Sequence, residues 1–312
     1  MRPERACGLR SNNHPDGTSG SVMISLKYEA PSSLGDAIAL LARESGTSRV
    51  LAGGTDMIVQ METDLIEPDL VVDIKKIPQL REIAIENGGF RVGAAVTGME
   101  LTDHQGFCKA WPGVVDGVKL IGSMQIKARA TMGGNLCNAS PAADSVPALI
   151  AAAAIARVAG PDGTRDVPVE GIPIGPGKTS LRKGEIVVSF LFPPRPSYSG
   201  DAYLRMTPRT EMDIAVVGVG VNVTLDADGV CAAARVSLGA VAPTVLLVEE
   251  AGAALVGSRL DAPALDRLAQ AAAAACRPID DKRGTREYRI KVAGVLAKRA
   301  AALALERARQ NP

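Results

Sequence analysis

The stretch from Thr131 to Asp144 constrains the fold of this 312-residue chain more than any other. It reads TMGGNLCNASPAAD, so two adjacent glycines are followed by two asparagines, a serine and an aspartate, all between two apolar segments. Adjacent glycines let backbone N–H groups turn toward one point, because no Cβ blocks close approach or a positive φ. Such an array binds anions, phosphates above all, but Gly-Gly and Ser-Pro are also ordinary turn residues. This stretch alone leaves both interpretations open.

A second glycine loop, AGGTD at Ala52 to Asp56, follows a strand predicted at Arg49 to Leu51 and precedes a predicted helical turn. A strand–glycine–helix junction presents free N–H groups with the positive end of a helix dipole behind them, which suits a pyrophosphate. The negative charge of Asp56 would repel a phosphate. Its side chain can equally cap the helix, or accept a hydrogen bond from a ribose or from the N–H of a flavin. Each loop alone is a weak signal. Two loops, each interpreted as the end of a strand, predict a clasp for the phosphate bridge of a dinucleotide.

Composition and charge exclude several classes of protein. The net charge is +1, which gives no reason to expect nucleic acid as a partner. The longest apolar run, Val146 to Ala156, is about half the length of a bilayer span and contains a proline, so no membrane span is predicted. Residues 1–22 have no hydrophobic signal region and little that packs, and we expect either a disordered extension there or a start upstream of the true one at Met23.

The five cysteines stand without any C-x-x-C spacing. This pattern argues against a disulfide framework and against zinc or iron–sulfur ligation within the chain, and it favours a reducing, cytoplasmic setting. The histidines are His14 and His104, and nothing around His104 resembles a nucleophile elbow. We therefore expect no metal ligands.

Strand and helix signals predict an α+β chain in three units, residues 23–77, 78–197 and 198–312, with a proline-rich boundary at 193–197. The second unit is expected to contain a helix over 110–121, interrupted by Pro112 near its start, and another that begins at Asp144. In the third, Val217 to Leu225 alternates strictly and pairs with Val230 to Leu238 in a hairpin. Helices over 245–256, 262–275 and 285 to about 307 would cover this β-meander.

These motifs resemble a known family, the FAD-binding subunits of molybdenum hydroxylases, which include the medium subunit of carbon monoxide dehydrogenase and the flavin domain of xanthine dehydrogenase. The resemblance rests on LAGGTD at 51–56, TMGGN at 131–135 and SPAAD at 140–144. It continues through GKT at 177–179, GEI at 184–186, YLR at 203–205 and DIA at 213–215, and it extends from Met23 to the C-terminal helix.

The resemblance implies an FAD-binding fold of the vanillyl-alcohol-oxidase type, with two α+β sub-domains and a separate C-terminal domain. Asp144 would be a polar contact of FAD, Ile186 or Val187 would pack on the flavin, and Arg205 would approach from the third unit. Relatives often have lysine at the last position, and the planar arginine fork hydrogen-bonds differently. The residues that would cradle FAD are Leu51, Ala52, Gly53, Gly54, Thr55, Asp56, Met57, Thr131, Met132, Gly133, Gly134 and Asn135.

The resemblance also implies an electron-transfer role without catalytic residues. FAD would receive electrons from a [2Fe-2S] small subunit and deliver them to a terminal acceptor, while a large subunit with the molybdenum cofactor would hydroxylate the substrate. The assembly would be a dimer of heterotrimers.

Two other readings are open. A stand-alone FAD oxidase of the same broad fold needs an acid–base group or a tether at the flavin, for which His104 and Cys137 are the candidates. A scaffold that has lost its cofactor is disfavoured by the intact glycine pairs.

Three further patterns are interpreted structurally. GKT at 177–179 lacks the first glycine of a P-loop and is expected to be a tight loop. Gly218 and Gly220 sit inside the alternating strand and are expected to serve packing. The basic residues of the C-terminal helix predict a solvated face, with contact to a partner subunit as the alternative; they are Arg286, Arg289, Lys291, Lys298 and Arg299.

Overall fold

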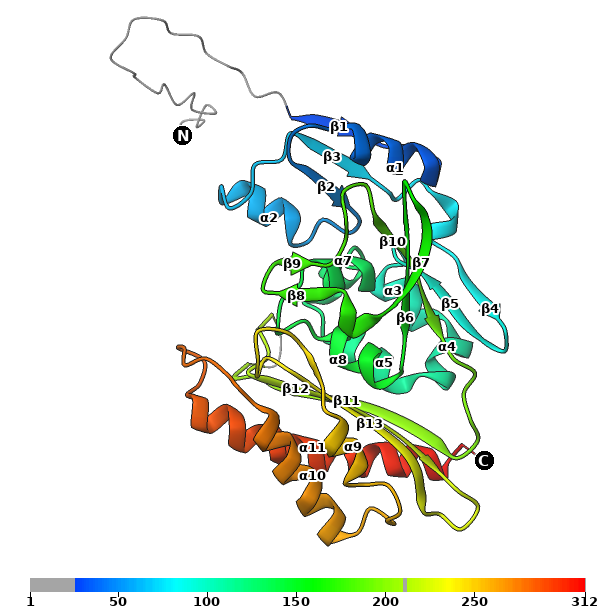
Figure 1. Ribbon diagram of the computed structural model, residues 1–312, viewed down its shortest axis with the longest axis vertical. Coiled ribbons are helices and arrows are strands. Elements are labelled where there is room, and N and C mark those ends of the chain that lie inside the picture. The colour runs from blue at the N-terminus through cyan, green and yellow to red at the C-terminus, as the bar shows by residue number, and fades with distance from the viewer. Residues whose placement is uncertain (1–25, 210–211, 312) are drawn as a thin grey trace, which may run out of the picture.

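The computed structural model describes residues 26–209 and 212–311. The expected disordered extension, residues 1–22, lies outside the described residues. The elements gather around three main sheets that follow one another along the chain (Figure 1).

The first sheet is parallel, with strand order β1 (Lys27–Glu29), β3 (Leu70–Asp73), β2 (Ser48–Leu51). Helix α1 (Leu34–Arg43) begins at Ser33, whose hydroxyl accepts from the N–H of Asp36, and it buries one apolar face. The short helix α2 (Met57–Glu62) follows β2 after the first glycine loop and buries none of its residues.

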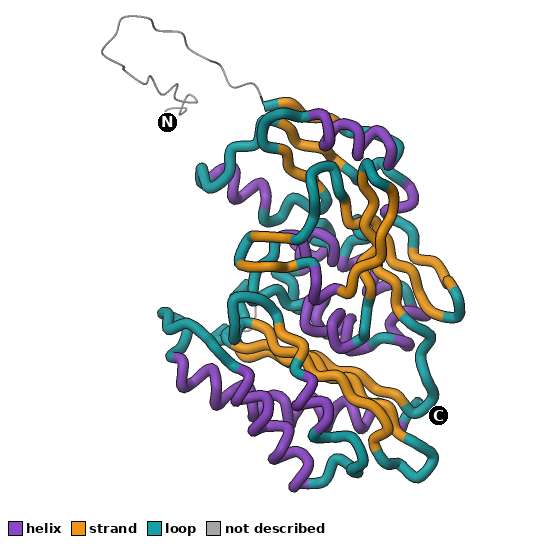
Figure 2. Tube along the Cα trace, in the orientation of Figure 1, coloured by secondary structure: helices purple, strands orange, loops and turns teal. Residues whose placement is uncertain are grey.

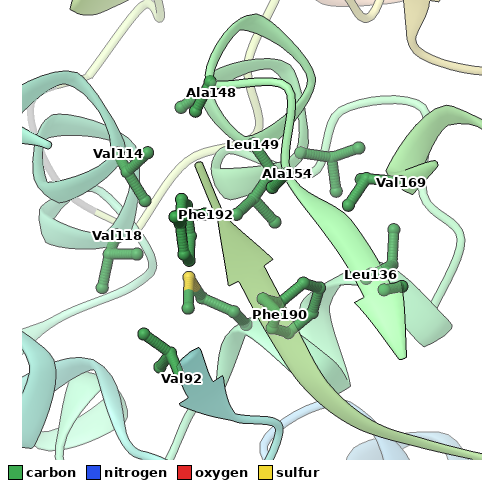
Figure 3. Packing of buried hydrophobic residues seen from close by; sticks show 14 of the residues in the cluster. Val92, Val114, Val118, Leu136, Ala148, Leu149, Ala154, Val169, Phe190 and Phe192 are labelled. Atoms are coloured by element: carbon green, nitrogen blue, oxygen red, sulfur yellow. The ribbon is translucent and has the colours of Figure 1, made fainter. Parts of the chain in front are cut away.

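The second sheet is antiparallel, with the order β4-β5-β10-β6-β7. Phe190 and Phe192 of β10 project from it into the largest core cluster, among side chains such as Val92, Val114 and Leu149 (Figure 3). A small hairpin, β8–β9, lies beside this sheet (Figure 1). The bounds are β4 Ile83–Glu86, β5 Gly89–Gly93, β6 Ile155–Gly160, β7 Gly163–Pro168, β8 Pro173–Gly175, β9 Lys178–Thr179 and β10 Ile186–Phe192.

Six α-helices and two 3₁₀ turns complete this part of the chain. The helix predicted over 110–121 is present as α5, which starts at Pro112, whereas Ala110 is the last residue of the preceding helix α4. Helix α8 begins after Asp144, as predicted. The bounds are η1 Pro78–Leu80, α3 Gly98–Asp103, α4 Gln105–Ala110, α5 Pro112–Lys119, α6 Met124–Lys127, α7 Met132–Cys137, α8 Ser145–Ala151 and η2 Val169–Gly171.

The third sheet is an antiparallel meander, β11 (Ser199–Met206), β12 (Val217–Leu225), β13 (Cys231–Gly239) and β14 (Leu246–Leu247). Helices α9 (Glu249–Ala253), α10 (Ala262–Ala275) and α11 (Arg286–Arg309) cover one of its faces, and helices α5 and α8 of the second unit pack on the other (Figure 2). The predicted hairpin of β12 and β13 is confirmed.

Two predictions for the third unit are wrong. The helix expected over 245–256 is limited to α9, because Leu246 and Leu247 pair with β13 as a strand. Arg289 does not belong to a solvated face: its side chain is buried, donates to the carbonyl oxygens of Val216 and Ala240, and forms an ion pair with Asp281 at 2.7 Å. It ties the start of α11 to the ends of β12 and β13.

Candidate functional site

A cavity of about 670 Å³ lies between the first glycine loop and the second unit. Its walls come from β2 and α2, from α7 and the residues after it, from the β8–β9 hairpin and from the start of β10. Every predicted cofactor residue lines this cavity except Met132, Asp144 and Arg205. Residues as far apart in the sequence as Ser48 and Val187 therefore share one site.

The first glycine loop presents an unpaired array of backbone donors. Gly54 has a φ of +76°, a conformation that favours glycine. Among the described residues, none of the N–H groups from Gly53 to Asp56 donates to a protein acceptor. A Cβ on Gly53 would lie 2.2 Å from the carbonyl oxygen of Arg129, so glycine is what allows this loop to approach the second segment. The loop has the geometry of an anion site.

Asp56 lies at this loop and lines the cavity. Asp56 occupies the N-cap position of α2, but its side chain makes no capping hydrogen bond. Partial burial raises the pKa of its carboxyl group, since the cavity wall removes water from the charged form. A protonated carboxyl group is neutral, so it repels an anionic ligand less than a carboxylate does.

The second glycine segment is built differently from the prediction. Gly133 and Gly134 lie inside helix α7, with neither at positive φ, and α6 rather than a strand precedes them. Thr131 caps the helix by accepting from the N–H of Gly134 at 2.9 Å. A Cβ on Gly133 would lie 2.5 Å from the carbonyl oxygen of Ala94. These glycines therefore serve close backbone approach rather than a left-handed turn.

Asn135 extends the polar wall. Its side-chain oxygen accepts from the hydroxyl of Ser145 at 2.7 Å, which leaves its amide N–H groups without a partner among the described residues. Ile186 and Val187 are buried in the protein and still contribute to the cavity lining, so the site has an apolar side as well. This combination of backbone donors, amides and apolar surface suits a ligand with phosphates and flat rings.

Asp144 and Arg205 do not line the cavity but form an ion pair with each other. The carboxylate lies 2.6 Å from Nη1 of Arg205 and accepts from the hydroxyl of Tyr203 at 2.9 Å. Burial raises the pKa of Asp144 to about 6, and the charge of Arg205 and the hydrogen bond of Tyr203 oppose that rise. The pair joins the start of α8, directly after the cavity wall, to β11 of the third unit. Met132 is buried in the core.

Two features of the site were missed. The turn of the β8–β9 hairpin brings Pro176 and Gly177 to the cavity, and the N–H of Gly177 donates to Ala139. The GKT motif marks this hairpin, so the tight loop is present and also belongs to the site. Gln60 lines the cavity as well, and no local pattern distinguishes it. Of the two tether candidates, Cys137 lines the cavity, whereas His104 caps α4 elsewhere.

Comparison with known proteins decides the family. Residues 23–195 match the model of the FAD binding domain in molybdopterin dehydrogenase, and residues 202–304 match that of the CO dehydrogenase flavoprotein C-terminal domain. The chain belongs to the FAD-binding subunits of molybdenum hydroxylases. It is therefore an oxidoreductase flavoprotein subunit with an FAD-binding domain followed by a flavoprotein C-terminal domain.

Individual members of the family are similar over nearly the whole chain. The carbon monoxide dehydrogenase medium chain of Afipia carboxidovorans is 36% identical, over 91% of this chain and 98% of the relative. The xanthine dehydrogenase FAD-binding subunit of Escherichia coli O157:H7 is 31% identical, over 87% and 93%. The solved structure of reconstituted CO dehydrogenase from Oligotropha carboxidovorans superposes with a TM-score of 0.87 at 35% identity, covering 91% of this chain and 98% of that one.

The residues present fit the cofactor that the family implies. The unpaired N–H groups of Gly53 to Asp56 match the charge of a pyrophosphate, and the cradle exists only because Gly53 and Gly133 lack a Cβ. Within residues 26–209 and 212–311, no group of three or more His, Cys, Asp or Glu side chains is placed to hold a metal ion. The same residues contain no helix with the length and apolarity needed to cross a bilayer.

Replacing Asp144 by asparagine should change how stability depends on pH. In the folded chain the pKa of Asp144 is about 6, above its ordinary value of 3.8, so the folded state takes up a proton between pH 6 and 4 that the unfolded state does not. The resulting stabilisation is present below pH 4 and is lost as pH rises through 6. The wild type should therefore gain about 2 kcal/mol relative to Asp144→Asn between pH 7.5 and 4.5.

Urea unfolding of both chains without cofactor at the two pH values measures this difference. Asp166→Asn provides a control of opposite sign, because its hydrogen bonds with Arg157 lower the pKa of Asp166. Its stabilisation is present at neutral pH and is lost on acidification. A pH-independent gap between the wild type and Asp144→Asn would show that Asp144 does not titrate as a buried carboxyl group.

Proposed function

We propose that this chain binds FAD in the 670 Å³ cavity and serves as the electron-transfer subunit of a molybdenum hydroxylase. The observation that carries the proposal is the meeting of two glycine segments, Ala52–Asp56 and Thr131–Asn135, on one cavity. When bound, FAD supplies the redox chemistry, receiving electrons from an iron–sulfur partner and passing them to a terminal acceptor. The protein supplies binding and orientation.

Each wall has a distinct part in this proposal. The N–H groups of Gly53 to Asp56 would hold the phosphates, and Asn135 would donate from its amide. Ile186 and Val187 would pack on a ring of the cofactor. The Asp144–Arg205 pair would orient the residues at the start of α8. Arg205, which belongs to the third unit, would balance the charge of Asp144 there.

The fold proposed for this part is of the vanillyl-alcohol-oxidase type, with sub-domains at residues 23–77 and 78–197 and a C-terminal domain at 198–312. Each of these ranges contains one of the three main sheets, which supports the division.

We also propose that the chain assembles with a [2Fe-2S] small subunit and a large subunit that carries the molybdenum cofactor, as a dimer of heterotrimers. The relatives that support this are medium chains or FAD-binding subunits, names that place each of them within a larger enzyme. The substrate would react on the large subunit, because the resemblance to the family implies no catalytic acid or base in this chain.

A stand-alone FAD oxidase is the second candidate, and the cavity does not favour it. Cys137 is the one predicted tether at the site, and burial raises its pKa to about 12, so the thiol stays protonated at neutral pH and is a poor nucleophile. His104 is held at the start of α4, where its Nδ1 accepts from the N–H of Phe107.

Reconstitution with FAD tests the proposal. The purified chain should bind one FAD and show flavin absorption bands, and it should reduce no oxygen with small organic substrates unless the partner subunits are added. Absence of flavin bands after reconstitution would refute FAD binding. Substrate-dependent oxygen consumption by the isolated chain would favour the oxidase instead.

A further inference from the structure

The wall formed by α2 differs from the rest of the cavity in how it is attached. Residues 54–66 run from the glycine loop through α2 to Ile66, and many of them line the cavity. Helix α2 buries none of its residues, and the side chains of Ile58 and Val59 are 45% and 54% exposed. This segment therefore has no apolar face packed into a core, unlike α1 beside it.

Hydrogen bonds show how little holds this wall in place. Within residues 54–66 the bonds are local, for example from the N–H of Ile58 to Gly54 and from that of Leu65 to Gln60. Among the described residues, one hydrogen bond leaves the segment: Nε2 of Gln60 donates to Oδ1 of Asn138 at 3.0 Å. Asn138 is the residue that ends α7, so this bond joins α2, which follows the first glycine loop, to the end of the helix that contains the second glycine pair.

Both ends of the wall are fixed more firmly. Gly53 packs against the backbone of Arg129, and the carbonyl oxygen of Glu67 accepts from the hydroxyl of Thr47 at 3.0 Å. A segment that is anchored at its two ends and unpacked between them can swing as a unit, with the ends as hinges. The Gln60–Asn138 bond is placed to resist that motion.

We infer that Gln60 and Asn138 form a latch that holds α2 closed over the cofactor cavity, and that α2 moves as a wall when the cofactor enters or leaves. This inference rests on the proposed function, in which the cavity takes FAD. Gln60 and Asn138 are positioning residues, because they act on the cofactor only by holding the segment of residues 54–66 in place.

The latch has a kinetic signature that a direct contact with FAD lacks. The bond joins two side chains of the protein and involves no atom of a ligand, so it stabilises the closed wall whether or not the cofactor is bound. Its loss makes the open wall more populated in both states and accelerates entry and exit by the same factor. One net hydrogen bond corresponds to about three- to tenfold. A direct contact would instead raise only the dissociation rate and weaken affinity.

Stopped-flow measurement of flavin fluorescence on the full chain tests this. Gln60→Leu and Asn138→Leu should each raise the association and dissociation rates of FAD about three- to tenfold, with Kd changed less than twofold. The double variant should match either single variant, because the second substitution removes a bond that is already lost. Gln125→Leu, the same change on exposed α6, should match the wild type.

Hydrogen exchange without FAD keeps this test separate from that of the proposed function. The amides of Ile58, Gln60 and Thr63, which are bonded within the segment, should exchange about three- to tenfold faster in Gln60→Leu and Asn138→Leu, while β12 stays protected. Unchanged exchange in both variants would overturn the latch. So would additive effects in the double variant, or a raised Kd with an unchanged association rate. If the wild type bound no FAD, the proposed function would be refuted, but the latch would not be.

Discussion

Gly53→Ala should weaken FAD binding by at least about a hundredfold and lower the free energy of unfolding by about 1–3 kcal/mol. The new Cβ would lie 2.2 Å from the carbonyl oxygen of Arg129 and 2.7 Å from its carbon. Both atoms belong to the backbone, so no flexible side chain can move aside. The loop must shift away from Arg129, and the N–H groups proposed to hold the pyrophosphate shift with it.

Titration of the refolded variant with FAD, followed by flavin fluorescence, measures the affinity, and urea unfolding measures the stability. Gly35→Ala is the matched control, because a Cβ at Gly35 meets no atom within 4 Å and the residue lies in α1, where alanine is favoured over glycine by about 1 kcal/mol. It should bind FAD normally and unfold at the same or higher urea concentration. Normal affinity in Gly53→Ala would disprove the tight approach of the two segments.

The sequence predicts elements best where local periodicity and burial agree. Residues 217–225 alternate with period two and form β12, whose apolar side chains fill the core of the third unit. The helix predicted over 245–256 is limited to α9 for the opposite reason. This apolar run has no strong helical periodicity, and Leu246 forms a strand because it pairs with Leu238, a partner that the local sequence does not reveal. Tertiary pairing overrides propensity there.

The candidate site was likewise predictable from the sequence only in part. The two glycine pairs are visible in the sequence, and they do lie on one cavity. Their conformations are not visible, since Gly133 is required by the backbone of Ala94, about forty residues earlier. Asp144 and Arg205 are each selected through the resemblance as contacts of FAD. That they bind each other depends on how the third unit packs, which the sequence does not show. The bond between Gln60 and Asn138 has no local signal.

A buried ion pair joins the FAD-binding domain to the C-terminal domain and provides the second large prediction. Asp201 of β11 is 2% exposed, and its carboxylate accepts from Arg195 at 3.0 Å and from the N–H of Val114 in α5 at 3.2 Å. The guanidinium of Arg195 lies 4.4 Å from the ring centre of Trp111. Arg307 of α11 pairs with Asp116 beside them at 2.6 Å. Burial raises the pKa of Asp201 to about 6, against the opposing charges of Arg195 and Arg307.

Arg195→Met should therefore lower the free energy of unfolding by about 3–5 kcal/mol at pH 7.5, because it leaves the carboxylate of Asp201 buried beside fewer cations. Without Arg195 the pKa of Asp201 rises further above its ordinary 3.8, so the folded variant takes up a proton more readily than the unfolded chain as pH falls. A neutral carboxyl group needs no cation. The deficit relative to the wild type should shrink at pH 5.

Trp111 is the single tryptophan of the chain and lies in this contact, so its fluorescence reports the urea transition directly. The matched control is Arg157→Met, which removes an arginine from a partly exposed pair with Asp166 and should cost less than about 1 kcal/mol. A deficit in Arg195→Met as small as that of the control, or one that grows on acidification, would show that Asp201 does not depend on Arg195 for its charge. The ion pair of Asp201 and Arg195 would then add little to the junction of the two domains.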